Sequence, residues 1–151
     1  MTFRHVRGND PTFMSEVAFL DANVRFYRYD RGDERKRHIA SALFRFRLQN
    51  RTLVISTQVV QEFHVSVTRK FGLGRRDARQ LVADLCELPL IVVTPQEILR
   101  ALQLETQHMV SFWDALILSA AETAGAQVVL SEDFTHDRTY GALRVVNPFL
   151  T

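Results

Sequence analysis

Apolar residues along the chain fall alternately into short continuous runs and into longer stretches with helical spacing. The short runs are typical of buried parallel strands. We predict five strands, at 17–20, 53–55, 90–93, 128–130 and 143–146. We predict helices at 34–50, 57–71, 75–87, from 95 onward, and at 111–124. This alternation predicts an α/β fold, a single domain with a mostly parallel central sheet of about five strands and helices on both faces.

The N-terminal residues do not share this pattern. Residues 1–13 are polar and lack the apolar segment of a secretory signal. We therefore predict a flexible N-terminal extension at 1–13 and one folded domain at 14–151, with Met14 as an alternative start. No stretch approaches the ~20 apolar residues of a membrane helix, so no membrane association is expected. The single cysteine, Cys86, excludes an internal disulfide and is expected to be a small buried residue of a cytoplasmic protein.

Charge is distributed unevenly, although the net charge is only +2. Residues 25–79 contain 14 Lys and Arg against 5 Asp and Glu, a net of +9, and the rest of the chain has a net of −7. A basic half suits a polyanion such as nucleic acid. A set of solvated helix faces explains the same charges equally well.

Four acidic residues are expected at one edge of the sheet. Asp21 follows the first strand, and Asp133 lies just past the fourth. Glu62 is in the first two turns of the helix after the second strand, and Asp114 begins the apolar helix at 111–124. Ligands of parallel sheets bind at the carboxyl ends of the strands. Four converging carboxylates repel one another unless a cation such as Mg²⁺ or Mn²⁺ is bound.

Each acid also has an ordinary structural interpretation. Asp21 can cap the following helix, Asp114 can interact with the N-terminus of its own helix, Asp133 can be a turn residue and Glu62 a surface residue. Singly, these interpretations are favoured. Together, four acids at one edge of an α/β sheet favour a common site.

Four short segments resemble the motifs of PIN domains, in the family's order. They are Phe19–Val24 (FLDANV), Ser56–Phe63 (STQVVQEF), Phe112–Ile117 (FWDALI) and Leu130–Phe134 (LSEDF). The closing segment Val145–Phe149 (VVNPF) is similar to one bacterial branch of that family. The likeness extends from about Val17 to Phe149.

The resemblance implies a metal-dependent endoribonuclease that leaves 5′-phosphate and 3′-hydroxyl ends. It implies that Asp21, Glu62, Asp114 and Asp133 bind Mg²⁺ or Mn²⁺ and are catalytic, and that Ser131 belongs to the catalytic site. Asn23 matches the family less firmly. Many relatives are VapC-type toxins, which implies a small antitoxin partner besides the RNA substrate.

Two further expectations follow from the same resemblance and from the charges. We expect a homodimer that uses exposed parts of the helices at 34–50 and 57–71. We also expect basic residues to guide the RNA backbone. The candidates are Arg25, Arg28, Lys70, Arg75 and Arg76.

Two other classes of function remain open. Asp21-Ala22-Asn23-Val24 comes close to the first motif of haloacid-dehalogenase-type phosphatases, but Asn23 stands where their second aspartate is needed. The other alternative is a catalytically inactive RNA-binding or interaction module. No HExxH motif or Cys/His zinc spacing occurs, so the histidines are expected to be non-catalytic.

Overall fold

A computed structural model describes residues 15–150 of the chain, and six strands form its single sheet. The strands are β1 (Ala18–Leu20), β2 (Leu53–Ser56), β3 (Leu90–Ile91), β4 (Val128–Leu130), β5 (Thr139–Tyr140) and β6 (Leu143–Val146). Their order is β3-β2-β1-β4-β6-β5, and every pair is parallel except β5 with β6. The predicted α/β fold and mostly parallel sheet are confirmed. The sequence pattern missed β5, because Thr139 and Tyr140 form no apolar run, and β3 is shorter than the strand predicted at 90–93.

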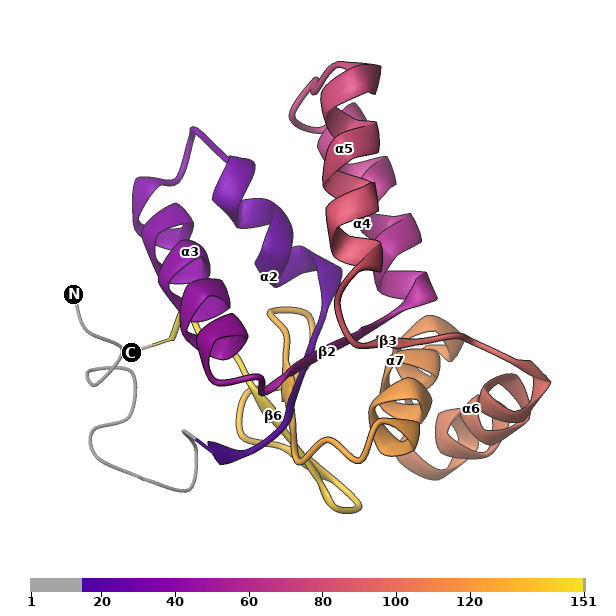
Figure 1. Ribbon diagram of the computed structural model, residues 1–151. Coiled ribbons are helices and arrows are strands. Elements are labelled where there is room, and N and C mark those ends of the chain that lie inside the picture. The colour runs from indigo at the N-terminus through magenta and orange to yellow at the C-terminus, as the bar shows by residue number, and fades with distance from the viewer. Residues whose placement is uncertain (1–14, 151) are drawn as a thin grey trace.

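Helices lie on both faces of this sheet, as expected. They are α2 (Ala22–Phe26), α3 (Glu34–Gln49), α4 (Thr57–Arg69), α5 (Arg75–Cys86), α6 (Pro95–His108) and α7 (Phe112–Thr123), with a 3₁₀ turn, η2, at Tyr27–Tyr29. Figure 1 shows α2 and α3 on one side, the α6–α7 pair on the other, and α4 and α5 as a hairpin that extends away from the sheet. Ser56 begins α4 with a side-chain cap on the N–H of Val59.

The core lies around the central strands β1 and β4, whose side chains are at most 2% exposed. Helix α7 covers this core with the continuous buried run Ala115–Ala121, so the predicted central helix is confirmed over that range. The expectation fails for its first turn, where Trp113 is 63% exposed. Local sequence cannot show where a helix extends past the layer that covers it.

Three other expectations concern features at the edges of the domain. Cys86 is exposed at the end of α5, so its predicted burial is wrong; the next residue inward, Leu85, takes the core position. The expected N-terminal extension lies outside the described residues. Within residues 15–150, no helix is both long and apolar enough to cross a membrane.

Candidate active site

The candidate site lies where the order of strands reverses. Strands β1 and β4 are parallel neighbours, with Leu20 opposite Leu130, yet β2 and β3 lie on one side of β1 and β4 lies on the other. The connections from β1 and β4 therefore diverge at their carboxyl ends, where open α/β sheets bind ligands. A cleft of about 500 Å³ opens there, and its walls include Asp21, Glu62 and Asp133.

Asp21 is held rigidly at the base of this cleft. It caps α2, and its Oδ1 accepts the backbone N–H of Ala22 at 2.7 Å. Its Oδ2 accepts the hydroxyl of Ser131 at 2.8 Å. The side chain is only 5% exposed. The carboxylate of Asp21 thus both caps α2 and lines the cleft.

Asn23 and Ser131 join the segments that follow β1 and β4. The amide nitrogen of Asn23 lies 3.3 Å from Ser131 Oγ and 3.4 Å from Asp21 Oδ2. Its Oδ1 accepts the N–H of Glu132 at 3.2 Å, while Ser131 Oγ accepts the N–H of Asp133 at 3.2 Å. These bonds set the position of the Ser131–Asp133 segment relative to Asp21.

Glu62 is connected to the beginning of α7 through Gln58. The amide nitrogen of Gln58 donates to Glu62 Oε1 at 2.9 Å and to the carbonyl of Trp113 at 3.2 Å. The sequence motifs did not single out Gln58, although it lies one helical turn before Glu62 and is 5% exposed. Asp114 follows Trp113; it is not among the residues that line the cleft.

Burial raises the pKa of Asp21 to about 7. The hydrogen bond from Ser131 opposes this rise, and so does the one from Ala22. The negative charges of Glu62 and Asp133 raise the pKa of Asp21 further. The folded protein therefore resists ionisation of Asp21 in the absence of a cation.

The pKa values of Glu62 and Asp114 are also raised, and hydrogen bonds again oppose the rise. Burial raises the pKa of Glu62; Gln58 lowers it, and the charges of Asp114 and Asp133 raise it. Burial also raises the pKa of Asp114, against the hydrogen bond with Ser111, and Asp133 adds to the rise. The four acids thus interact electrostatically as one group, although Asp114 lies outside the cleft lining.

These acids fit a hard, hydrated cation. Within residues 15–150, no Lys or Arg forms an ion pair with any member of the group Asp21, Glu62, Asp114 and Asp133. The same residues contain no three His, Cys, Asp or Glu side chains close enough to bind one metal ion together. Mg²⁺ commonly keeps several waters and binds one or two carboxylates directly. The acids are suited to that kind of binding, with the others reached through water.

Arg25 does not lie where a phosphate contact requires it. Its guanidinium is buried, 3.7 Å from the centre of the Phe44 ring, and donates to Tyr29 Oη at 3.2 Å. The prediction that Arg25 guides RNA is therefore wrong. The helix α2 turns this side chain towards Phe44 of α3.

The sequence profile of the PIN domain matches residues 18–142. The chain belongs to the PIN domain family. No curated protein matches the sequence. Membership in the PIN family confirms the resemblance and disfavours the phosphatase alternative.

Solved structures share the PIN fold at low sequence identity. The sarcin–ricin loop cleaving toxin VapC20 of Mycobacterium tuberculosis is 21% identical, with a TM-score of 0.62, over 77% of this chain and 91% of the toxin. A chain of a toxin–antitoxin complex from Klebsiella pneumoniae is 18% identical, with a TM-score of 0.63, and the match covers 87% of this chain and 97% of that chain. A chain of VapBC2 from Rickettsia felis, in a structure bound to a fragment of promoter DNA, is 18% identical, with a TM-score of 0.59. The match covers 85% of this chain and 96% of that chain. Nearly the whole length of each of these chains is matched.

Proposed function

We propose that this PIN domain is a Mg²⁺- or Mn²⁺-dependent endoribonuclease and the toxin of a toxin–antitoxin pair. The observation that carries the proposal is the cleft at the strand reversal, where the buried Asp21 and the partly buried Glu62 have raised pKa values and no basic partner among the described residues. A divalent cation is the simplest compensation for such a group.

The residues of the site have separate roles in this mechanism. Asp21, Glu62, Asp114 and Asp133 hold the cation, directly or through water. When bound, the cation supplies Lewis acidity to the attacking water and to the departing oxygen. Ser131 and Asn23 keep Asp21 in a fixed orientation, and Gln58 does the same for Glu62.

The hairpin of α4 and α5 provides a path for the RNA backbone. A second hollow of about 700 Å³ lies between these helices and includes His64, Thr68, Arg75 and Arg79. Five basic side chains on the hairpin are exposed and form no ion pair within residues 15–150: Arg69, Lys70, Arg75, Arg76 and Arg79. Lys70 also lines the acidic cleft, so the basic surface reaches the site where a phosphate is cut.

The toxin role rests on the relatives. The solved structures with the same fold include toxin–antitoxin complexes, and one relative is described as a toxin that cleaves the sarcin–ricin loop. We infer an RNA substrate, a small antitoxin that blocks the cleft, and a homodimer. An inactive module is disfavoured because all four acids are present and none is neutralised.

Cleavage of a labelled single-stranded RNA, with and without Mn²⁺ or Mg²⁺, tests the activity. We expect products with 5′-phosphate ends, no cleavage in a chelator, and a loss of about 100-fold or more in Asp21→Asn. Folding is checked by circular dichroism. A folded wild-type protein that hydrolyses a small phosphomonoester but no RNA contradicts the proposal. Co-purification with the product of an adjacent small reading frame tests the antitoxin.

A further inference from the structure

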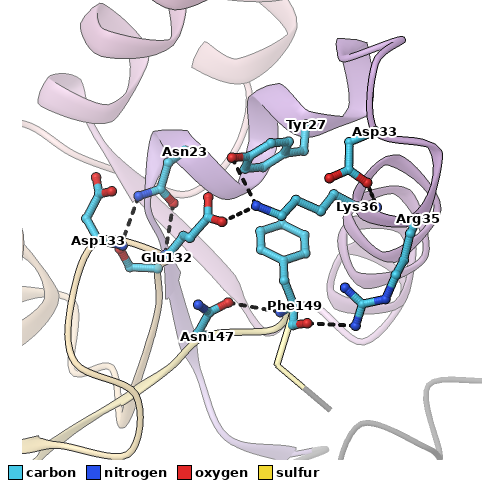
Figure 2. A network of polar contacts seen from close by, with 10 residues as sticks. Asn23, Tyr27, Asp33, Arg35, Lys36, Glu132, Asp133, Asn147 and Phe149 are labelled. Carbon is cyan, nitrogen blue, oxygen red and sulfur yellow. Dashed lines mark hydrogen bonds and ion pairs between the residues drawn. The ribbon is translucent and has the colours of Figure 1, made fainter.

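An ion pair lies directly beside the candidate site and belongs to none of the roles above. Glu132 is between Ser131 and Asp133 and lines the same cleft, and its carboxylate pairs with Lys36 in the first turn of α3. Figure 2 shows the pair between η2, α3 and the C-terminal segment. The two side chains are 23% and 25% exposed, so solvent only partly screens the pair.

Two aromatic rings enclose the ammonium of Lys36. Its Nζ lies 4.4 Å from the centre of the Tyr27 ring and 5.2 Å from that of Phe149, and it donates to Tyr27 Oη at 3.2 Å. The two rings meet edge to face at 5.0 Å. Contacts with a carboxylate, a hydroxyl and two rings restrict Lys36 to one position.

The closing motif of the chain supplies one side of this enclosure. Asn147 Oδ1 accepts the N–H of Phe149 at 3.0 Å, and Arg35 donates to the carbonyl of Phe149 at 2.8 Å. The N–H of Asn147 donates to His136 Nδ1 at 3.0 Å, a structural role for that histidine. The motif Val145–Phe149 therefore has a physical purpose, because it brings the Phe149 ring against Lys36.

Hydrogen bonds connect the pair to the acids of the site. Glu132 donates its N–H to Asn23 Oδ1 at 3.2 Å, and Asn23 contacts both Asp21 and Ser131. Glu132 therefore contacts Lys36 through its side chain and the site residue Asn23 through its backbone.

We propose that Lys36 is a positioning residue of the nuclease site. By pairing with Glu132, it holds the Ser131–Asp133 segment in the register at which Asp21 and Asp133 share one cation. This inference rests on the proposed metal-dependent activity. A purely electrostatic role predicts the opposite effect on cation binding, because removal of a positive charge near four acids strengthens the binding of a cation.

The test compares Lys36→Met, Glu132→Gln and the double variant with the wild-type protein. Mn²⁺ binding is measured from the rise in melting temperature as Mn²⁺ is added. RNA cleavage is measured at saturating Mn²⁺. For Lys36→Met we expect the half-maximal Mn²⁺ concentration to rise about tenfold and kcat to fall roughly 10–100-fold, with KM little changed. The double variant is expected to be no worse than the worse single variant, because the two residues act through one contact.

Arg100→Met is the matched control. Arg100 forms an ion pair with Glu122 through two bonds of 2.9 and 3.1 Å, between α6 and α7, and among residues 15–150 neither residue is hydrogen-bonded to the four acids. We expect it to leave the Mn²⁺ titration and kcat unchanged. Tighter or unchanged Mn²⁺ binding in Lys36→Met, or additive losses in the double variant, overturns the inference. If Lys36→Met does not fold, Glu132→Gln, which weakens the contact but keeps an acceptor for Lys36, must show smaller losses in the same direction. A wild-type protein that neither responds to Mn²⁺ nor cleaves RNA overturns the proposed function itself.

Discussion

Two kinds of acidic side chain lie at the carboxyl edge of the sheet, and they differ in their partners. Glu132 is paired with Lys36, whose ammonium lies against the rings of Tyr27 and Phe149. Its sequence neighbour Asp133, and with it Asp21 and Glu62, faces the cleft without a basic partner among residues 15–150. The fold thus gives Glu132 a cationic partner and leaves the neighbouring acids without one. The difference indicates which acids are available to a cation. The amino-acid sequence alone does not distinguish the paired acid from the unpaired ones.

The basic side chains of the two helical hairpins differ in the same way. Arg100 on the α6–α7 pair is neutralised by Glu122. The α4–α5 hairpin leaves five exposed cations without an ion pair in the described part of the chain. These unpaired charges are available to a polyanion.

The largest effect is expected from Asp114→Asn, which keeps the shape of the side chain and removes its charge. Cleavage should fall about 100-fold or more, because the cation loses a charged partner. Stability without metal should be unchanged or higher at pH 8, because repulsion of Glu62 and Asp133 is relieved. Mn²⁺ should raise the melting temperature less than in the wild type. A folded variant with wild-type cleavage and wild-type Mn²⁺ stabilisation removes Asp114 from the site.

The double charge reversal Arg75→Glu with Arg79→Glu tests the basic hairpin. We expect kcat/KM to fall about tenfold at 0.1 M salt, with a weaker dependence on salt, because phosphate contacts are lost. The Mn²⁺ titration should stay unchanged, since the cleft is intact. Arg100→Glu serves as the control for a reversed charge on the other hairpin. Equal losses in both variants would mean that the hairpin has no special role in binding RNA.

The third prediction concerns the pH dependence of stability without metal. The folded protein raises the pKa of Asp21 to about 7, so folding favours the protonated form. The contribution of Asp21 to stability is therefore greatest below about pH 4, falls as the pH rises to about 7, and is constant above. Relative to Asp21→Asn, the wild-type melting temperature should drop by roughly 5–10 °C between pH 4 and pH 8. Saturating Mn²⁺ should reduce this drop; a constant difference between the two proteins at all pH values would disprove the buried, repelled state of Asp21.

The smallest effect is expected from loss of the ion pair between Arg100 and Glu122. Glu122→Gln removes the partly exposed partner of Arg100. Such pairs contribute about 0–1 kcal/mol, so the change in the free energy of unfolding should be within that range. Urea denaturation at neutral pH measures it. A loss above ~2 kcal/mol would show that the α6–α7 pair depends on this contact far more than a surface ion pair should.

Local patterns accounted for most elements of the fold and for the placement of Asp21 and Asp133 at one edge of the sheet. Apolar runs mark buried strands, and Thr94 with Glu97 marks the start of α6, where Glu97 accepts the N–H of Thr94 at 2.9 Å. The positions of Asp21 and Asp133 after strands placed them at one edge, because parallel strands end together. These features depend on neighbours within a few residues, so they can be read along the chain.

Tertiary structure alone decided which charges are neutralised and which side chains are covered. Lys36 and Glu132 are 96 positions apart, and Asp21 and Ser131 are 110 apart. No local period contains such a pairing. The burial of Arg25 against Phe44 and the exposure of Cys86 depend in the same way on which helix lies alongside. The sequence by itself placed Asp21 and Asp133 at the carboxyl edge of the sheet. The packing of distant segments decided which acids keep an uncompensated charge, because the cost of a buried charge depends on the partner that the fold brings to it.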